Sequence, residues 1–438
     1  MYGPPPSPSQ IDLAVSPWTT LLCIALGILI TSTARIRALS PRTKAWLFCF
    51  GQTLMLTAPL GLMISQGVYG DYPTIDKAGS YFYYQDGVHI RSLLHPIQSL
   101  DDCAVQLIGV HMGHLWLTQF FDLFLSGYGP FNAQALLMPA LAWWTAALFF
   151  RELGADWRGA ISLALPYGLT LHIFRDLNWY TIEKSAIFLL PAYAFLLLRS
   201  HRRGGSWIVL SALCFVSAAW INWYLALVAA AGAGTAALIA RSANLWRAVL
   251  LSAALLMPLV AYQLALVSRG SPGDPQAFLE LRASMDHFSL VPLEWNRLEW
   301  WAALSPVALG LLLHRLLREP LENVDRVLLL VSCVLFVFSL GPNLIGELSN
   351  PIYMVAWHTV PGFWRVAKPE VFFYGSWLCM LGVASRGALS RKRVVYPALL
   401  LTWVLLTRPH ETYPGFTEEI PLQPALCTQA LPTGTQAP

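Results

Sequence analysis

The sequence predicts an all-α polytopic membrane protein with about twelve transmembrane helices, and three observations support this fold class. Apolar residues make up 56% of the 438 residues. Charged residues make up 12%, against about 25% in soluble domains. The mean hydropathy is +0.53. A soluble fold of this size could not cover its surface with so little charge, so lipid must cover much of it.

The charge balance and the cysteines limit the partners. The net charge of +4 is spread over the whole length, so it forms no basic face and disfavours nucleic-acid binding. The seven cysteines show no Cys-x-x-Cys or Cys/His metal spacing, and five of them lie in apolar runs, where we expect packing thiols. Cys103 and Cys427 lie outside those runs, and the sequence leaves open whether they pair.

Twelve apolar runs are candidate spans, because a helix that crosses a bilayer needs about 17–25 mostly apolar residues. These runs lie at 17–34, 45–66, 131–150, 158–174, 182–199, 207–222, 223–240, 247–268, 300–317, 324–340, 371–387 and 394–408. Several are short, which indicates helices that begin or end inside protein rather than at the lipid headgroups.

The loops between the spans form two alternating sets. One set, with eighteen Lys/Arg and five acidic residues, lies at 35–44, 151–158, 199–206, 241–247, 315–326 and 386–393. The other set, with both tails, holds ten Lys/Arg and nineteen acidic residues. Because Lys/Arg excess marks the cytoplasmic side, we expect the first set inside and both termini outside a cell (inner or plasma) membrane. The same rule requires two crossings within 207–240, with a turn near Asn222.

This topology divides the chain into a membrane domain and external segments. The multi-span domain covers 17–408, and its main external loop is 67–130. Within that loop, 104–126 is predicted to lie on the outer surface as an amphipathic helix rather than to cross. The other external segments are the N-terminal tail 1–16, the smaller loops 269–299 and 341–370, and the irregular C-terminal tail 409–438.

The first part of the main loop, 67–102, concentrates ionisable groups just past a helix end. They are Asp71, Asp76, Asp86, Asp101, Asp102, His89, Arg91 and His95. Folding does not require such a density, so a carboxylate here is a candidate general base for a hydroxyl acceptor. His89 and Arg91 are candidate substrate-binding residues. A solvated, hydrogen-bonded loop is the alternative.

A metal site is the weaker interpretation of this loop. Asp101 and Asp102 could hold a divalent cation through oxygen ligands, but adjacent side chains point in different directions on regular backbone. The histidines show no zinc-type spacing with a fixed carboxylate partner. The sequence therefore requires no cofactor and leaves a divalent cation open.

A second candidate patch lies in loop 341–370. Arg365 and Lys368 are two of the ten basic residues expected on the outer side, and they stand among aromatic residues. Arginine as a planar fork and lysine as a point charge suit a phosphate headgroup. Snorkelling to ordinary lipid headgroups and pairing with Glu370 are the alternatives.

The spans themselves carry little polar chemistry. No Asp, Glu, Lys or Arg lies in the middle of any run. Ion-coupled transporters usually need such intramembrane groups as relays. The pattern therefore favours chemistry at the outer surface over transport through the bundle.

Several diffuse passages between about 45 and 410 are similar to a known family. They are Asp71 and Asp76 ahead of Gly79-Ser-Tyr-Phe-Tyr-Tyr84, Tyr128-Gly-Pro-Phe-Asn132, Leu153-Gly-Ala-Asp-Trp-Arg-Gly-Ala160, Leu165-Pro-Tyr167, Pro191, and the stretch from Pro351 to Pro369. Together they resemble the GT-C-type polytopic membrane glycosyltransferases and their bacterial relatives. The additional span 17–34 and the ending Lys368-Pro-Glu370, in place of a second arginine, depart from the family pattern.

The resemblance implies transfer of a sugar from a polyprenyl-phosphate donor to an acceptor on the extracytoplasmic side. In such enzymes the first external loop holds the catalytic Asp, so Asp76 or Asp71 is the base candidate, and Asp76-x-x-Gly-x-x-Phe82 favours Asp76. Arg365 and Lys368 are then the candidates for the carrier phosphate. The expected partners are the lipid bilayer, this donor and an acceptor that the sequence does not name. The alternatives are a non-catalytic lipid- or polymer-handling membrane protein on the same scaffold and, less favoured, a transporter.

Overall fold

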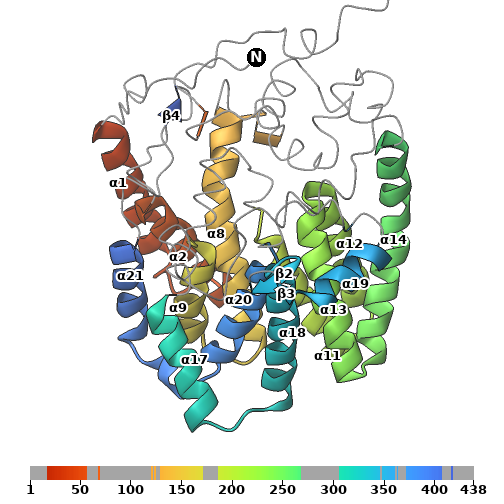
Figure 1. Cartoon of the computed structure of the whole chain (residues 1–438). Coiled ribbons are helices and arrows are strands. Elements are labelled where there is room, and N and C mark those ends of the chain that lie inside the picture. Colours follow the sequence, from red (N-terminus) through yellow and green to blue (C-terminus); the bar gives the residue numbers. More distant parts are fainter. Residues whose placement is uncertain are drawn as a thin grey trace, which may run out of the picture.

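The computed structural model describes residues 17–56, 68–69, 120–121, 123–124, 129–170, 186–267, 305–345, 348–360, 363, 371–406 and 416–417. This part of the chain is a bundle of helices with two very short sheets (Figure 1). The prediction of a mostly helical protein is confirmed for these residues.

Short turns join several of the helices that the structure describes. The first eight are α1 (Pro17–Thr33), α2 (Pro41–Leu56), α8 (Gly129–Glu152), α9 (Trp157–Gly168), α11 (Leu189–Arg203), α12 (Ser206–Ile221), α13 (Trp223–Ala240) and α14 (Ala243–Val267). The C-terminal part adds α17 (Pro306–Arg318), α18 (Asn323–Ser339), α19 (Pro351–Thr359), α20 (Val371–Ser385), the 3₁₀ helix η4 (Ala388–Arg391) and α21 (Val395–Leu406). Each of the twelve candidate spans overlaps one of these helices, although the ends of span and helix differ by several residues.

Two antiparallel pairs of short strands accompany the helices. They are β1 (Val68–Tyr69) with β4 (Phe416–Thr417), and β2 (Asn343–Ile345) with β3 (Leu348–Ser349). In the first pair Val68 lies opposite Thr417, so the chain that follows α2 meets the chain that follows α21. β1 also contacts α8.

Polar side chains set the points at which two of the helices begin. Asn222 ends α12 and caps α13, because its Oδ1 accepts the backbone N–H of Tyr224 at 2.9 Å. The turn predicted near Asn222 is therefore confirmed as a break between two helices. Asp156 caps α9 in the same way and accepts the N–H of Gly159 at 2.7 Å. Such caps satisfy N–H groups that have no partner within the helix.

The core is rich in aromatic side chains, and some of its polar atoms form hydrogen bonds between helices. The largest fully buried side chains are Trp143, Tyr167, Tyr353, Phe150, Phe372, Phe373 and Met138. Trp143 Nε1 donates to the carbonyl of Ile161 at 2.8 Å, which joins α8 to α9. The hydroxyls of Ser332 and Ser376 lie 2.9 Å apart, and each is also near the other residue's carbonyl, at 3.1 and 3.0 Å. These contacts fix α18 against α20 without leaving a buried hydroxyl unpaired.

The close crossing of α1 and α2 depends on two glycines. A methyl group at Gly27 would lie 2.7 Å from the carbonyl oxygen of Gly51, and a methyl group at Gly51 would lie 2.7 Å from that of Gly27. Backbones at this distance leave no space for a larger residue. Small residues at helix crossings are typical of helices that pack within lipid.

The outer faces of the bundle are apolar. Large exposed side chains include Leu22 and Leu29 on α1, Leu213 on α12, Leu250 and Met257 on α14, and Leu401 on α21. Two described helical segments, Trp223–Ala240 and Ala243–Ala261, are long and apolar enough to cross a membrane. Soluble monomers rarely expose apolar patches larger than a few hundred Å², so these faces require cover by lipid or by protein.

The cysteines of the apolar runs are free thiols. Cys23, Cys49 and Cys379 are buried, as expected for packing thiols, and Cys214 is half-buried. Cys333 is exposed on the outer face of α18, which corrects the expectation of a packed thiol there. The possible pair of Cys103 and Cys427, and almost all of the helix predicted at 104–126, lie outside the described residues.

Candidate functional site

The residues that the sequence selects for catalysis and binding lie outside the described residues. They are Asp71, Asp76, His89, Arg91, Asp101, Asp102, Arg365 and Lys368. Their roles stay predictions, and so does a divalent cation at the two adjacent acids. Among the described residues, no group of three or more His, Cys, Asp or Glu side chains could hold a metal ion.

The structure does describe the anchors from which the candidate segments begin. Asp71 follows β1 in the chain, and β1 pairs with β4 and contacts α8. Arg365 and Lys368 lie between Phe363 and Val371, which are only 3% and 5% exposed. Both candidate segments therefore begin at ordered positions on the helical bundle.

The Phe363 anchor is held by an aromatic cluster. Its ring lies 5.1 Å from that of Tyr353 in α19, 5.9 Å from that of Phe338 in α18 and 6.1 Å from that of Phe372 in α20. Aromatic pairs at these separations stabilise their packing beyond the area that they bury. The cluster thus ties the chain ahead of Arg365 to three helices.

A single asparagine places α19 beside the end of α18. Asn350 Nδ2 donates to the carbonyl oxygens of Val337 and Gly341 at 2.7 and 2.9 Å. Its Oδ1 accepts the N–H of Tyr353 at 3.2 Å and caps α19. The Asn350 side chain is fully buried, so these bonds satisfy an amide that would otherwise be costly to bury.

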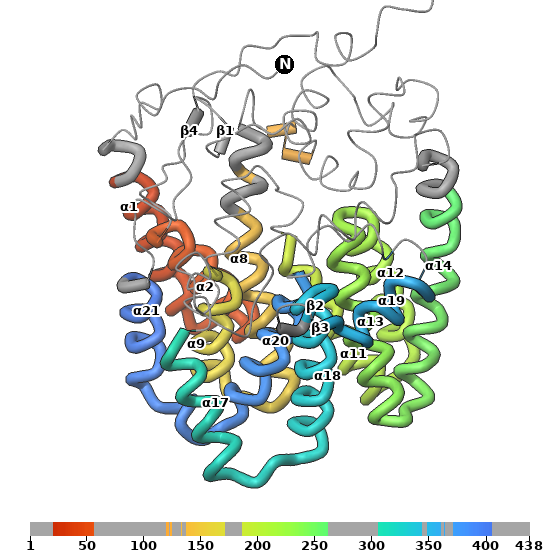
Figure 2. Tube along the Cα trace, viewed as in Figure 1, coloured from red at the N-terminus to blue at the C-terminus, as the bar shows by residue number. Residues whose placement is uncertain are grey.

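The first residues of α18 lie in a group of charged segments that we call the charged end. These segments are 35–44, 151–158, 199–206, 241–247, 315–326 and 386–393. Within the described part of the chain, every Asp, Glu, Lys and Arg lies in these segments. Contacts join Glu152 to Arg202, His201 to Ser242, Gly159 to Ser390 and Glu322 to Arg386. Figure 2 shows the α13–α14 and α17–α18 turns together at the lower end of the bundle. Segment 35–44 lines a pocket together with residues of 151–158 and 199–206, so the six loops that the charge pattern groups lie at one end.

The length of α18 separates this charged end from the aromatic cluster. α18 has 17 residues, which corresponds to about 25 Å of helix. It begins beside the charged α17–α18 turn and ends near Asn350 and α19. The anchor of the Arg365 segment is thus on the far side of the bundle from the described charges (Figure 1).

A buried ion-pair network lies within the charged end. Asp325 is 0% exposed and meets two guanidinium groups, with Arg315 Nη2 at 2.9 Å from Oδ2 and Arg386 Nε at 3.2 Å from Oδ1. Arg315 also donates to Glu319 at 2.6 Å, and Arg386 pairs with Glu322. The network connects the α17–α18 turn to the end of α20.

Two acids of the network, Glu319 and Glu322, have pKa values below their usual range. Burial would raise the pKa of Glu319, but the backbone N–H of Ala388 and the guanidinium of Arg315 stabilise its carboxylate and lower the pKa overall. The hydrogen bond from Arg386 lowers the pKa of Glu322. Both carboxyl groups are therefore ionised at neutral pH, and their negative charges face the positive charges of the arginines.

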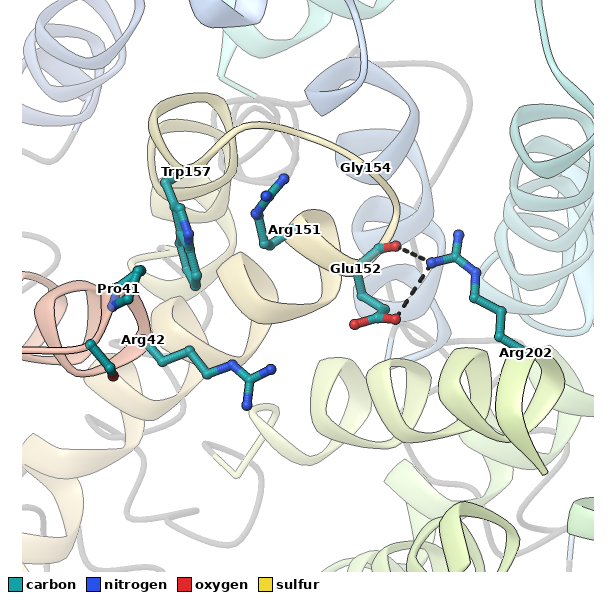
Figure 3. A pocket seen from close by; sticks show the side chains of 8 residues that line it. Pro41, Arg42, Arg151, Glu152, Gly154, Trp157 and Arg202 are labelled. Atoms are coloured by element: carbon teal, nitrogen blue, oxygen red, sulfur yellow. Dashed lines mark hydrogen bonds and ion pairs between the residues drawn. The ribbon is translucent and has the colours of Figure 1, made fainter. Parts of the chain in front are cut away.

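An open pocket lined by three arginines lies elsewhere at the charged end, and we call it the arginine pocket. Its volume is about 620 Å³, and its lining residues are Ser40, Pro41, Arg42, Arg151, Glu152, Gly154, Trp157 and Arg202. Figure 3 shows Arg42 extending from the start of α2 and Arg202 reaching Glu152 from the end of α11. The pocket therefore lies where three helix ends and the start of α9 meet.

The α8–α9 turn shapes one wall of this pocket. Gly154 has a φ of +106°, a conformation that residues with a side chain rarely adopt. Its N–H bonds the carbonyl of Arg151 at 3.1 Å, and Asp156 then caps α9. The passage Leu153–Ala160, one of those that resemble the family, is thus a tight helix–turn–helix in this structure.

A second cavity, of about 630 Å³, is apolar. It lies between α8, α11, α13, α18 and α20, and small residues of α13 such as Ala229, Gly232 and Ala233 leave the space. Three of its polar lining residues, His201, Asn323 and Arg326, belong to the charged end. The apolar cavity therefore borders the charged turns.

Comparison with models of known protein families gave no match to the chain, and comparison with curated protein sequences gave none either. The resemblance to the GT-C-type enzymes therefore stays a prediction from the sequence passages.

Sequence reasoning grouped the charged loops but missed the two features that they build. The Glu322-x-x-Asp325 spacing is a capping-box signal, and both of its reciprocal bonds are present. That signal could have located Asp325 at a helix start, but not its burial between two arginines. Arg42, Arg151 and Arg202 come from three separate segments, and no spacing along the chain shows that they line one pocket.

Proposed function

We propose that this chain is an integral-membrane glycosyltransferase of the GT-C type, which moves a sugar from a polyprenyl-phosphate donor to an acceptor on the extracytoplasmic side. One observation carries the proposal: the charges of the described residues gather at one end, while the anchor of the Arg365 segment lies at the other. This separation leaves the far end available for chemistry, which agrees with the sequence passages that resemble the family.

Placement in a membrane is the first part of the proposal. The apolar outer faces and the two long apolar helices support it. An excess of Lys/Arg marks the cytoplasmic side, so the charged end faces the cytoplasm across the inner or plasma membrane. Both termini and loop 67–130 are then extracytoplasmic, and the twelve helices that match the candidate spans cross the bilayer.

The chemistry is the second part. Asp76, or Asp71 in its place, removes the proton from an acceptor hydroxyl, whose oxygen attacks the anomeric carbon of the sugar. The bond from that carbon to the carrier phosphate breaks, and Arg365 and Lys368 stabilise the phosphate as it leaves. A single displacement of this kind inverts the anomeric configuration. The mechanism requires no metal ion.

The transfer assay uses the purified protein with polyprenyl-phosphate sugars and an extract of envelope acceptors. Asp76→Asn keeps the shape of the side chain but removes its basicity, so turnover should fall by about 10²–10⁴-fold. Asp71→Asn should be milder. Loss of turnover in Asp71→Asn alone would move the base five residues upstream.

A second candidate function is a non-catalytic lipid-handling protein on the same scaffold. The apolar cavity favours it, because a cavity lined by small aliphatic side chains suits a hydrocarbon chain. Full activity of both aspartate variants, or no transfer with any lipid-linked sugar, would favour this second function over the transferase.

A further inference from the structure

The arginine pocket has one carboxylate among its lining residues, and that carboxylate is already shared. Glu152 Oε2 lies 3.0 Å from Nε of Arg199, and Oε1 lies 3.4 Å from Nη1 of Arg202. Arg202 also donates to the backbone carbonyl of Glu152 at 2.6 Å, and Figure 3 shows this guanidinium turned toward Glu152. Glu152 is thus paired with two arginines of α11, Arg199 and Arg202.

The two other arginines of the pocket have no acidic partner among the described residues. Arg151 Nη1 donates to the neutral carbonyl of Ala155 at 2.7 Å, and its guanidinium carbon lies 6.0 Å from the ring of Trp157. The side chain of Arg42 is exposed and forms no hydrogen bond or ion pair with a described residue. The pocket therefore carries positive charge that its own side chains do not neutralise.

Helix stability does not explain the position of Arg42. It lies in the first turn of α2, where a cation opposes the helix dipole and an acid is favoured, yet that turn holds no acidic residue. Ser40 Oγ accepts the N–H of Thr43 at 3.2 Å, so the start of α2 is capped within the protein. The positive end of the helix and the Arg42 guanidinium thus both border the pocket.

The chemistry of the pocket fits a phosphate group. Guanidinium groups bind phosphate oxygens in pairs through their planar fork. A volume of about 620 Å³ lies in the range of small-molecule sites. The half-buried Trp157 indole on the wall is the kind of side chain that lies at the level of lipid headgroups.

We propose that the arginine pocket binds the phosphate of an anionic phospholipid headgroup from the leaflet at the charged end. The inference rests on the membrane placement proposed above and not on glycosyl transfer. A lipid source is favoured over a soluble phosphate because the pocket opens at the ends of helices whose bundle has apolar outer faces that need lipid cover.

The test compares lipid binding by the intact protein and by two double variants, each lacking two positive charges. The pocket variant is Arg42→Gln with Arg151→Gln. The matched control is Arg318→Gln with Arg393→Gln, which are exposed arginines of the charged end outside the pocket. Delipidated protein in detergent receives phosphatidylglycerol or phosphatidylcholine, and native mass spectrometry measures the bound lipid.

We expect the unchanged protein and the control to retain phosphatidylglycerol in preference to phosphatidylcholine. The pocket variant should lose that preference by about tenfold or more, as is typical for the loss of charge-assisted hydrogen bonds. Equal loss in the control would show diffuse attraction to the charged end and would overturn the proposal. Retention by the pocket variant would overturn it too.

A second arm separates the lipid from a soluble anion. Inorganic phosphate is added to the delipidated protein, and the melting temperature is compared with that in phosphatidylglycerol. The proposal expects the lipid to raise it more. An equal rise with phosphate alone, absent in the pocket variant, would assign the site to a soluble anion and refute the lipid. Neither readout depends on transferase activity, so failure of the transferase proposal would leave these results unchanged.

Discussion

Removal of Asp325 should destabilise the protein strongly, although it is one side chain at the end of the bundle. Asp325 is fully buried, and the two arginines that face it are 7% and 10% exposed. Asp325→Ala leaves both guanidinium groups without their common partner. Breaking a buried ion pair by removing one member costs about 3–5 kcal/mol, because a buried charge is left uncompensated.

The remaining contacts place the expected cost at the lower end of that range. Arg315 keeps Glu319 at 2.6 Å, and Arg386 keeps Glu322. We therefore expect a loss of about 3 kcal/mol for Asp325→Ala. Asp325→Asn keeps an oxygen acceptor and loses the charge, and its cost should be about 1.5–2 kcal/mol, near that of one hydrogen bond to a charged group.

The measurement is the free energy of unfolding in mixed micelles, from a titration with a denaturing detergent at constant lipid. The matched control is Arg326→Ala, because Arg326 follows Asp325 in α18 but is exposed. It should change stability by less than about 0.5 kcal/mol. If the free energy of unfolding of Asp325→Ala equals that of this control, the network contributes no stability and the reasoning is refuted.

Two other outcomes follow from the proposals. Arg365→Ala should raise the KM for the lipid-linked donor about tenfold or more, and Lys368→Ala should raise it less, because water more easily replaces a point charge. Unchanged donor kinetics in both variants would favour the alternative that these side chains snorkel to ordinary lipid headgroups. The lowered pKa of Glu319 means that its contribution to stability is present above its usual value of 4.5 and is lost as the pH falls through the lower value in the folded protein. The free energy of unfolding is measured from about pH 6 to about pH 3, where acid unfolding occurs. It should fall less with pH in Glu319→Gln than in the unchanged protein, and identical pH profiles would contradict this.

The helical architecture could be predicted from the sequence because apolar runs and charged loops alternate. A described helix overlaps each of the twelve predicted runs, and Asn222 separates two helices where the charge rule requires a turn. Helix ends were less predictable. α2 begins at Pro41, ahead of the apolar run at 45, because proline fits the first turn of a helix.

The candidate site could be predicted from the sequence only in part. The sequence named an acidic loop and a basic patch, but those residues lie outside the described structure, so their roles remain predictions. The arginine pocket and the Asp325 network were not predictable, because they depend on which turns become neighbours in space. Arg42 and Arg202 are 160 positions apart in the sequence, and only the packing of α2, α8 and α11 places them in one pocket.

Sidedness of cysteine labelling tests the central claim most directly, which is that the charged end faces the cytoplasm and the candidate catalytic loop faces outward. Single cysteines are introduced as Ser40→Cys and Arg393→Cys at the charged end and as Ser80→Cys in loop 67–130, after Cys103 and Cys427 are replaced by serine. A membrane-impermeant maleimide added to intact cells should label Ser80→Cys, and should label the other two only after the membrane is opened. Labelling of Ser40→Cys and Arg393→Cys from outside, with Ser80→Cys protected, would invert the topology and remove the proposed site from the extracytoplasmic side.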